Sequence, residues 1–395
     1  MKPSRFLSIF ICGLILLSCA EGGIVPDTEV DLKLELQKSE AGRSKGYFFV
    51  DVTASGEWSL ALDFGEGVQS WATLTQYAGK DSKKGIILSY DALTGTGTRS
   101  LAVNLTCRGK SVSRTFTQGA AASSGMLHSA NAGWLELPAT DSEDGMDWGL
   151  VKMTSPQGTS MRNYSYYWDY DNLVAHWVAY PLNRSLIGGS VDRTNEWGVD
   201  PNLSTTYQPV LYKAYRGGFD RGHQLPSADR LLNRDANVQT FYGVNMTPQL
   251  GAGFNQSIWS SLEGKVRSWA GSCDTLYVVT GCVVRNNSTS GSYGEVGGYA
   301  LDNDGKKVSV PTAYYKAVLR YKKDGANATY QACAIYLEHK NYSSSYRVSK
   351  SDFMSIDELE RITGVDFFVN LPKVIGESEA AKVEAQDPST VSIWW

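Results

Sequence analysis

The run Gly119-Ala-Ala-Ala-Ser-Ser-Gly125 is the feature that most constrains the fold of this 395-residue chain. It contains no apolar side chain larger than alanine, so no hydrophobic core can continue through it. At roughly 100–200 residues per domain, the chain on each side is long enough to bury a core of its own. We therefore expect one domain over residues 27–120, a linker at 121–126, a second domain over 127–375 and a tail at 376–395.

The first residues have the features of a bacterial secretory signal. Two basic residues precede an apolar run from Phe6 to Leu17, and Leu16-Leu17-Ser18-Cys19 is similar to a lipobox. This predicts removal of residues 1–18 and a lipid on Cys19, with an ordinary cleaved signal peptide as the alternative. The acidic residue two places after Cys19 favours an outer-membrane lipoprotein displayed on the bacterial surface. Its only contact with the membrane would be this anchor.

Composition narrows the class of protein. The 37 Lys and Arg against 41 Asp and Glu give a formal charge of −4, which excludes a strongly basic nucleic-acid scaffold. A charged fraction of 20% with 11% aromatic residues excludes intrinsic disorder. No stretch after residue 20 supplies the roughly 20 apolar residues that a membrane-spanning helix needs. The body is therefore globular, and any polyanion must be bound locally.

Four cysteines follow the signal, at positions 107, 273, 282 and 333. Disulfides persist in an exported protein, so we expect a structural bridge whose pairing the sequence leaves open. The nearest two, Cys273 and Cys282, are nine residues apart, which is not the spacing of a zinc site. Cys107 lies in the first domain and is expected to stay unpaired.

The first domain has the pattern of short antiparallel strands. Leu101, Val103 and Leu105 alternate with small or polar residues, which is typical of a half-buried sheet. Strands are expected over 46–53, 85–90, 99–106 and 110–117. A small β-sandwich is the simplest fold for them.

The stretch from Ser70-Trp71 through Gly95-Thr-Gly-Thr-Arg-Ser100 to Thr115-Phe-Thr-Gln-Gly119 resembles the immunoglobulin-like domains of the BACON type. The default role of such a domain is that of a spacer. Trp58 and Trp71 could form a platform for a glycan, but tryptophans buried in the sandwich are the more common case.

Asp220-Arg-Gly-His223 carries the chemistry of the second domain. A histidine with a pKa near 6.5 can accept a proton from water, and Arg221 can hold phosphate oxygens through its planar guanidinium group. A second arginine, Arg230, follows in the same stretch. The combination suits an anionic phosphodiester, with His223 as the base.

Residues Asn255 to Trp269 contain few helix breakers and have the apolar spacing of an amphipathic helix. Asn255 and Glu263 are eight residues apart, about 80° around an α-helix, so both can point to one side. An amide oxygen and a carboxylate are hard ligands suited to Mg²⁺ or Mn²⁺ held mostly through water. The alternatives are that Asn255 is a helix N-cap and that Glu263 is a solvated helix residue.

Three blocks together resemble one family. Asp220-Arg-Gly-His223, Asn245-Met-Thr-Pro-Gln249 and Asn255-Gln-Ser-Ile-Trp-Ser-Ser-Leu-Glu263 are similar to the DRGH, NxxPQ and NQxxWxxLE motifs of the DNA/RNA non-specific endonucleases of the ββα-metal superfamily. The likeness extends over essentially the whole second domain. It implies an α+β domain of the ββα-metal type, with a mixed, largely antiparallel sheet flanked by helices, behind the small all-β sandwich.

The resemblance also implies roles for individual residues. His223 would act as general base, Asn255 would be the direct protein ligand of one Mg²⁺ ion, and Mn²⁺ could replace it. Glu263 would hold the metal through water, and Asn245 would support the site. The substrates would be DNA and RNA, cut with little sequence preference because the contacts are to the backbone.

An arginine usually steadies the scissile phosphate in this family. Arg193 is the candidate, although its distance to the following aromatic residue is longer than the family's spacing, and Arg221 could share the task. The other histidines, 128, 176 and 339, are expected to be structural or on the surface.

The alternative to a nuclease is a surface protein that binds nucleic acid or glycan without catalysis. The tail at 376–395 is polar and acidic, but its last residues, Ile393-Trp-Trp395, are apolar enough to dock on the body.

Overall fold

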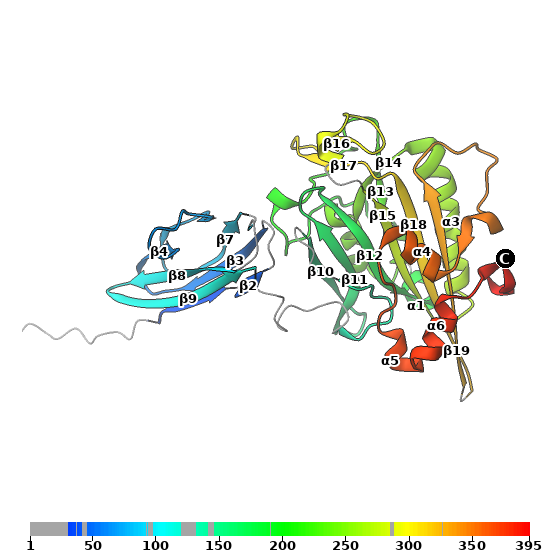
Figure 1. Ribbon diagram of the computed structural model, residues 1–395, viewed down its shortest axis with the longest axis horizontal. Coiled ribbons are helices and arrows are strands. Elements are labelled where there is room, and N and C mark those ends of the chain that lie inside the picture. Colours follow the sequence, from blue (N-terminus) through cyan, green and yellow to red (C-terminus); the bar gives the residue numbers. More distant parts are fainter. Residues whose placement is uncertain are drawn as a thin grey trace, which may run out of the picture.

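The computed structural model describes residues 31–395 apart from 37, 42–45, 92, 94–97, 120–131, 141–145, 190, 285–287 and 326. Two folded parts follow each other along the longest axis, with the all-β part at the left of Figure 1. The expected signal, Cys19 as the expected site of lipidation, the expected linker and His128 lie outside the described residues. None of the helices in the described part has the length and apolar character to cross a membrane.

The first part consists of two sheets packed around one core. The four-stranded sheet has the order β1-β3-β7-β5, and the five-stranded sheet has the order β2-β9-β8-β4-β6. Their bounds are β1 Lys33–Leu36, β2 Glu40–Ala41, β3 Gly46–Thr53, β4 Glu57–Asp63, β5 Ala72–Leu74, β6 Ala78–Lys80, β7 Lys83–Tyr90, β8 Arg99–Cys107 and β9 Lys110–Gln118. The four strands expected from the sequence coincide with β3, β7, β8 and β9.

Both tryptophans proposed as a glycan platform belong to the core of this sandwich. Trp58 is 4% exposed and Trp71 is 5% exposed, and Trp58 Nε1 donates to the carbonyl of Asp81 at 2.7 Å. A sugar cannot stack on rings that the protein covers. The prediction of a glycan platform at Trp58 and Trp71 is therefore wrong. The alternative, that both tryptophans are buried in the sandwich, is confirmed.

The second part is built on a seven-stranded sheet with the order β10-β11-β12-β15-β18-β19-β20. Every pairing in it is antiparallel. Its strands are β10 Met146–Thr154, β11 Ser160–Asp169, β12 Val174–Leu182, β15 Thr275–Val283, β18 Ala313–Asp324, β19 Asn327–Glu338 and β20 Phe353–Met354. Two small hairpins pair β13 Asp220–His223 with β14 Met246–Gln249 and β16 Tyr299–Leu301 with β17 Lys307–Ser309.

Side chains of the large sheet alternate between two cores. On β12, Val178 and Tyr180 enter the core shared with η5 and α3, whereas Trp177 and Ala179 enter the core shared with α4, α5 and α6. The helices are α1 Arg184–Ile187, α2 Arg234–Gln239, α3 Ser260–Ala270, α4 Ile356–Thr363, α5 Leu371–Ile375, α6 Glu377–Glu384 and the π-helix η5 Gly251–Trp259. Short 3-10 turns are η2 Thr205–Tyr207, η3 Ser227–Asp229, η4 Gly243–Asn245, η6 Ser288–Ser290, η7 Lys350–Asp352, η8 Pro388–Thr390 and η9 Ser392–Trp394.

The tail docks on the body, as its apolar end predicts. Trp394 is fully buried and meets the Trp269 ring edge-on, with 5.0 Å between centroids. Trp395 packs on Phe353 at 4.6 Å.

The expected disulfide is wrong, because Cys273, Cys282 and Cys333 are free thiols; Cys107 is free as well, as expected. Cys282 is on β15 and Cys333 on β19, and β18 lies between them. Two strand spacings of about 4.8 Å place the two cysteines at least about 10 Å apart, and Cys333 is also four residues out of register with Cys282. A disulfide spans at most roughly 7 Å between Cα atoms. Burial raises the pKa of both thiols, which keeps them protonated.

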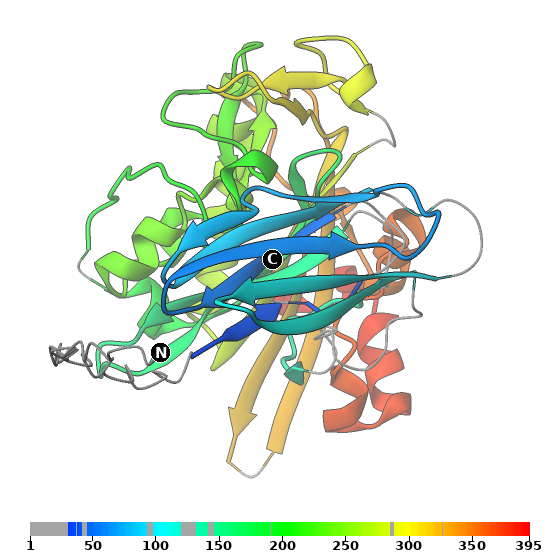
Figure 2. The ribbon, with the colours of Figure 1, turned by 90° about the vertical axis from the view of Figure 1, so that its left-hand side faces the viewer.

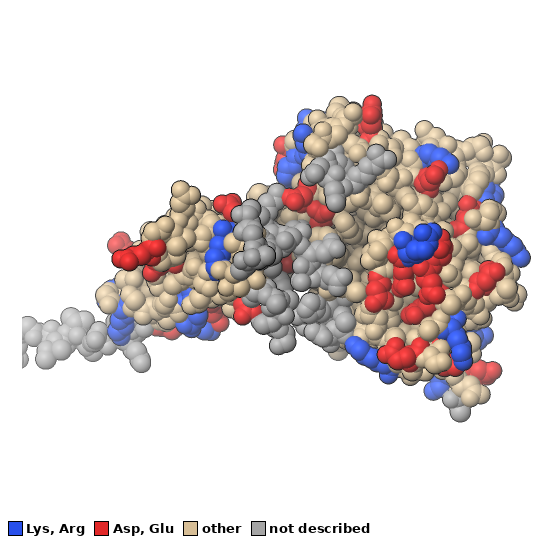
Figure 3. All heavy atoms as spheres, in the orientation of Figure 1, with Lys and Arg blue, Asp and Glu red and all other residues tan. Residues whose placement is uncertain are grey.

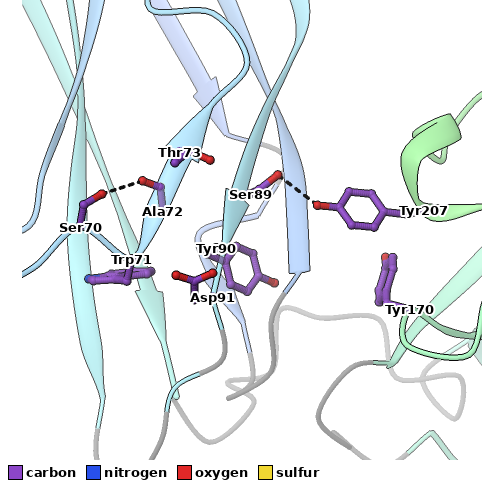
Figure 4. Close-up of a pocket in the computed structure, with 9 residues that line it drawn as sticks. All are labelled: Ser70, Trp71, Ala72, Thr73, Ser89, Tyr90, Asp91, Tyr170 and Tyr207. Carbon is purple, nitrogen blue, oxygen red and sulfur yellow. Dashed lines mark hydrogen bonds between the residues drawn. The ribbon is translucent and has the colours of Figure 1, made fainter. Parts of the chain in front are cut away.

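The two parts meet through aromatic side chains. The rings of Tyr47 and Tyr207 stack with 4.2 Å between centroids, and the Tyr47 hydroxyl accepts a hydrogen bond from the amide of Ser204 at 2.9 Å. The hydroxyls of Ser89 and Tyr207 bond at 3.1 Å beside a cavity of about 180 Å³ at the junction (Figure 4). Figure 2, viewed from the side of the sandwich, shows the sandwich in front of the second part. The junction is thus a packed contact.

Candidate active site

The β13–β14 hairpin brings two of the sequence blocks side by side. Asp220 is paired with Gln249 and His223 with Met246. Gly222 is required there, because a Cβ on it would lie 2.2 Å from the side chain of Gln249. Arg221 and His223 point to one side of the strand and Asp220 to the other.

Asn245, at the end of η4, is fully buried beside this hairpin. Its Nδ2 donates to the carbonyls of Leu225 at 2.9 Å and Thr240 at 2.8 Å, and its Oδ1 accepts from the amide of Leu225 at 2.8 Å. All three bonds tie neighbouring loops to the hairpin. The side chain therefore holds the backbone that follows His223, and it does not face a substrate.

His223 is 7% exposed, and its Nε2 has no hydrogen-bond partner among the described residues. Its ring contacts the edges of Phe241 at 5.1 Å and Trp197 at 5.7 Å between centroids. Burial, then the charges of Arg193 and Arg221, lower the pKa of His223 to about 3, against a hydrogen bond to the Arg221 backbone. The imidazole is therefore neutral at neutral pH, with one nitrogen free to accept a proton.

Both candidate arginines lie beside this histidine. Arg221 stacks its guanidinium on Trp197 at 3.4 Å from the ring centroid and donates NH1 to the carbonyl of Leu211 at 3.0 Å. Arg193 lies over Phe241 at 4.9 Å and donates NH1 to Ser227 Oγ at 2.7 Å. Trp197 and Phe241 thus each contact His223 and one arginine. The sequence assigns Phe241 no role in the site, and it marks Trp197 only as the aromatic residue that follows Arg193.

The helix with Asn255 differs from the expected one. Residues Gly251–Trp259 form a π-helix, in which the amide of Asn255 donates to the carbonyl of Leu250 at 2.9 Å, and the α-helix begins only at Ser260. Asn255 lies inside η5, so the N-cap alternative is wrong. The 100° step that related Asn255 to Glu263 does not hold through the wider π turns.

Asn255 is tied to the hairpin by its amide nitrogen. Its Nδ2 donates to Asp220 Oδ2 at 3.0 Å. The amide oxygen of Asn255, Oδ1, points away from this bond and has no hydrogen-bond partner in the part of the chain that is described. Trp259 Nε1 donates to the carbonyl of His223 at 3.3 Å. These two bonds hold η5 against β13.

Glu263 projects from α3 into a group of buried charges. Burial raises the pKa of its carboxyl, and Lys316 on β18 is the strongest opposing influence, followed among the arginines by Arg267 and Arg193. Lys316 is fully buried and donates to Thr280 Oγ1 at 2.7 Å. Within the described residues Glu263 makes no hydrogen bond or close ion pair, so its oxygens are available to a ligand.

Sequence reasoning missed the ionic support behind Glu263. Arg267 NH1 pairs with Asp229 Oδ1 at 2.9 Å, and Asp229 is 1% exposed. Arg267 follows Glu263 by four residues, so the same-face rule for helices could have found it. Lys316 comes from a strand 53 positions later in the chain, and nothing near Glu263 in the sequence signals it.

Arg230, expected to help bind the phosphodiester, is fully buried elsewhere. Its Nε donates to Asn163 Oδ1 at 2.6 Å, and NH2 donates to the carbonyls of Asn163 at 2.9 Å and Pro181 at 3.0 Å. Its donors are used within the protein, so that expectation is wrong. His176, paired with Asp169 at 2.9 Å, and the buried His339 also lie outside the catalytic group.

The residues present fit one hard divalent cation. An amide oxygen from Asn255 and a carboxylate from Glu263 have no protein partner among the described residues, and both are oxygen donors that Mg²⁺ accepts. No group of three His, Cys, Asp or Glu gathers in the described part. A cation here would therefore have few protein ligands and many waters.

Comparison with known proteins gives a consistent set of matches. The family model described as DNA/RNA non-specific endonuclease matches residues 149–374. A protein named "Nuclease" from Nostoc sp. is 31% identical over 243 residues, which are 59% of this chain and 81% of that protein. "Nuclease 1, mitochondrial" from Schizosaccharomyces pombe is 30% identical over 182 residues, covering 46% of this chain and 56% of that protein's length.

Among solved structures, one titled as the EndoG/EndoGI complex is similar at 24% identity with a TM-score of 0.44. It covers 56% of this chain and 86% of that one.

Proposed function

The chain belongs to the DNA/RNA non-specific endonuclease family, and from this membership we propose that it hydrolyses internal phosphodiester bonds of both DNA and RNA. The observation that carries the proposal is His223, a buried neutral imidazole whose Nε2 lacks a protein partner and which lies between two arginines. A neutral imidazole with a free nitrogen can accept a proton from a water that attacks a phosphate, and the arginines beside it can bind the oxygens of that phosphate.

Each residue then has a defined task. His223 Nε2 accepts the proton of the attacking water. Arg193 and Arg221 bind oxygens of the scissile phosphate and stabilise the additional negative charge of the transition state. Asn245 keeps the backbone after His223 in place through its three hydrogen bonds. Because these groups contact phosphate oxygens, we expect little sequence preference.

We propose Mg²⁺ as the cofactor, with Mn²⁺ as a substitute. Asn255 Oδ1 would bind the ion directly, and Glu263 would hold it through water. When bound, the ion would neutralise the phosphate and stabilise the leaving 3′-oxygen as a Lewis acid. Asp220 orients Asn255 for this task by accepting its Nδ2–H.

The location in the cell envelope also stays a proposal, supported by residues 1–19 alone. A lipid on Cys19 would hold the enzyme at the outer membrane, where DNA and RNA outside the cell are its substrates. The role could be nutrition, defence or attack, and a glycan contact of the sandwich is not favoured by its buried tryptophans.

The test compares the protein with its His223→Ala variant on closed circular plasmid and on single-stranded RNA, in Mg²⁺ and in chelator. Removing the general base is expected to reduce cleavage of both substrates by roughly 10²–10⁴-fold. His176→Gln is the matched control, because His176 pairs with Asp169 outside the site and its loss leaves cleavage intact.

Opening of the closed circle in Mg²⁺, lost in chelator and in His223→Ala, supports an endonuclease with this mechanism. A wild type that leaves plasmid and RNA intact in Mg²⁺ and Mn²⁺ contradicts the proposal. In that case binding without cleavage becomes the better explanation of the site.

A further inference from the structure

Tyr212 is an exposed aromatic residue adjacent to the catalytic group. Its side chain is 59% exposed, and the Nζ of Lys213 lies 5.9 Å from its ring centroid. The residue before it, Leu211, is buried and accepts the NH1 hydrogen bond of Arg221 on its carbonyl. The peptide group between Leu211 and Tyr212 therefore contacts Arg221, which is proposed to bind phosphate, and leads directly to the exposed ring of Tyr212.

The backbone that carries Tyr212 is fixed on both sides. The amide of Val210 donates to Asp302 Oδ2 at 2.9 Å, and the amide of Lys213 donates to Asn303 Oδ1 at 2.6 Å. The amide of Asn303 returns a bond to the carbonyl of Val210 at 3.0 Å. Buried Leu211 anchors the segment between these bonds. The ring is thus held on a rigid support, which lowers the entropy that it loses when a ligand binds.

A ligand that fits both Tyr212 and Lys213 must have a flat face and must carry a phosphate. An exposed tyrosine ring on a fixed backbone stacks on planar groups, and the ammonium group beside it attracts an anion. A nucleobase with its backbone phosphate has both properties. In a duplex the faces of internal bases are covered by their neighbours, so only an unpaired base can reach the ring.

We propose that Tyr212 and Lys213 form a subsite for an unpaired nucleotide next to the scissile phosphate, so that the enzyme binds single-stranded nucleic acid more tightly than duplex. This inference rests on the proposed function, because the scissile phosphate is the one that Arg221 binds. Tyr212 stacks on the base, and Lys213 contacts a neighbouring phosphate. Since every base has a stackable face, the subsite adds strand preference without sequence preference.

The experiment measures binding of fluorescein-labelled oligonucleotides to the His223→Ala protein, which cannot consume them. The ligands are a mixed-sequence single strand, the same strand in a duplex, and a single strand with abasic sites at its centre. Tyr212→Ala is expected to weaken binding of the intact single strand roughly tenfold and to leave the duplex and the abasic strand within about twofold. Tyr212→Phe keeps the ring and restores the affinity.

Two further variants separate stacking from charge. Lys213→Gln is expected to reduce the slope of log affinity against log salt concentration by about 1 for all three ligands, because one phosphate contact is lost. Tyr77→Ala removes a tyrosine that is 47% exposed on the sandwich and serves as the matched control. Its three affinities should equal those of the parent.

The outcomes distinguish this inference from the proposed function. If the His223→Ala parent binds none of the three ligands, the proposed function itself fails. If the parent binds them but Tyr212→Ala leaves the intact single strand unaffected, or weakens it no more than the abasic strand, the nucleobase subsite is overturned while the nuclease remains.

Discussion

A single carboxylate, Asp220, links the residue proposed as base to the residue proposed as metal ligand. It belongs to the same short strand as His223, and its Oδ2 accepts from Asn255 Nδ2 at 3.0 Å and from Gln256 Nε2 at 2.7 Å. Fixing the amide nitrogen of Asn255 also fixes its oxygen, since the two are joined through one planar group. The DRGH block therefore contributes an orienting acid as well as a base.

Replacing Asp220 by alanine should weaken Mg²⁺ binding. Without the acceptor the amide of Asn255 can rotate, and loss of such an outer partner typically costs 10–100-fold in metal affinity or activity. The expected result is a Mg²⁺ requirement shifted upward by about that factor in plasmid cleavage, with partial recovery at high Mg²⁺. Gln256→Ala, which removes the other donor to the same carboxylate, is the control and should keep the wild-type Mg²⁺ curve. An unchanged curve for Asp220→Ala would show that Asn255 is oriented without it.

At the scale of elements, the π-helix η5 depends on a distant strand end. His339, just after β19, accepts the amide hydrogen of Leu250 on Nε2 at 2.8 Å, and its Nδ1 bonds to the carbonyl of Pro311 at 2.7 Å. Leu250 precedes η5, and its carbonyl accepts the amide of Asn255. The amide of Tyr342 also donates to the carbonyl of Gly253 at 2.9 Å. The segment from His339 to Tyr342 therefore sets where η5 begins.

His339 should make stability depend on pH. Burial lowers its pKa to about 4, whereas an unfolded chain protonates histidine near 6.5. Between these values the unfolded state binds a proton that the folded state does not, so the free energy of unfolding falls as the pH falls from about 6.5 to 4. Over that range one group changes the stability by about 1.4 kcal/mol per pH unit.

The measurement is urea unfolding of the wild type and His339→Gln at pH 7.5 and pH 5. The glutamine is expected to reduce the loss between these two conditions by about 2 kcal/mol, because one fewer titrating group contributes. His223, whose pKa is also lowered, adds to the loss in both proteins, and the raised pKa values of Glu360 and Glu384 oppose the loss equally in both. An equal loss in both proteins would mean that His339 is protonated in the folded state at pH 5.

Local patterns predicted the parts of the fold that depend on neighbours in sequence. Alternation located β8 correctly, since Leu101, Val103 and Leu105 are all buried. The predictions that failed concern residues whose contacts are with partners far along the chain. The π turns of η5 require His339, and the burial of Arg230 requires Asn163. No property of the residue itself shows whether an arginine will face a substrate or a buried carbonyl.

At the scale of the molecule, one face of the large sheet is marked by acidic side chains. Acidic side chains gather over the region of α4 on the face seen in Figure 3. There, burial and the charges of neighbouring acids, Asp366 and Asp357 among them, raise the pKa of Glu360 and of Glu384 to about 7. Arg193 and Arg221, the two arginines proposed to bind phosphate, lie on the side of η5 and α3, which cover the opposite face. The acidic face over α4 therefore repels a polyanion, and the arginines beside His223 lie away from it.

The sandwich and the catalytic domain should unfold together because of Tyr47. Its ring is buried between them, stacked on Tyr207 and edge-on to Tyr170 at 5.7 Å, and its hydroxyl satisfies the amide of Ser204. Truncating a buried aromatic side chain costs about 3–5 kcal/mol, whereas losing one hydrogen bond costs about 1 kcal/mol. The contact therefore couples the two parts mainly through the ring.

Differential scanning calorimetry of the whole protein tests this coupling. We expect one transition in the wild type, two in Tyr47→Ala as the sandwich melts separately, and a single, slightly lowered transition in Tyr47→Phe. Tyr77→Ala, exposed on the same sandwich, loses the hydrogen bond that its hydroxyl accepts from the amide of Leu74 at 3.1 Å, so it should lower stability by about 1 kcal/mol and keep one transition. Two transitions already present in the wild type would mean that the packed junction does not couple the unfolding of the two parts. The sandwich would then be a spacer that folds and unfolds independently.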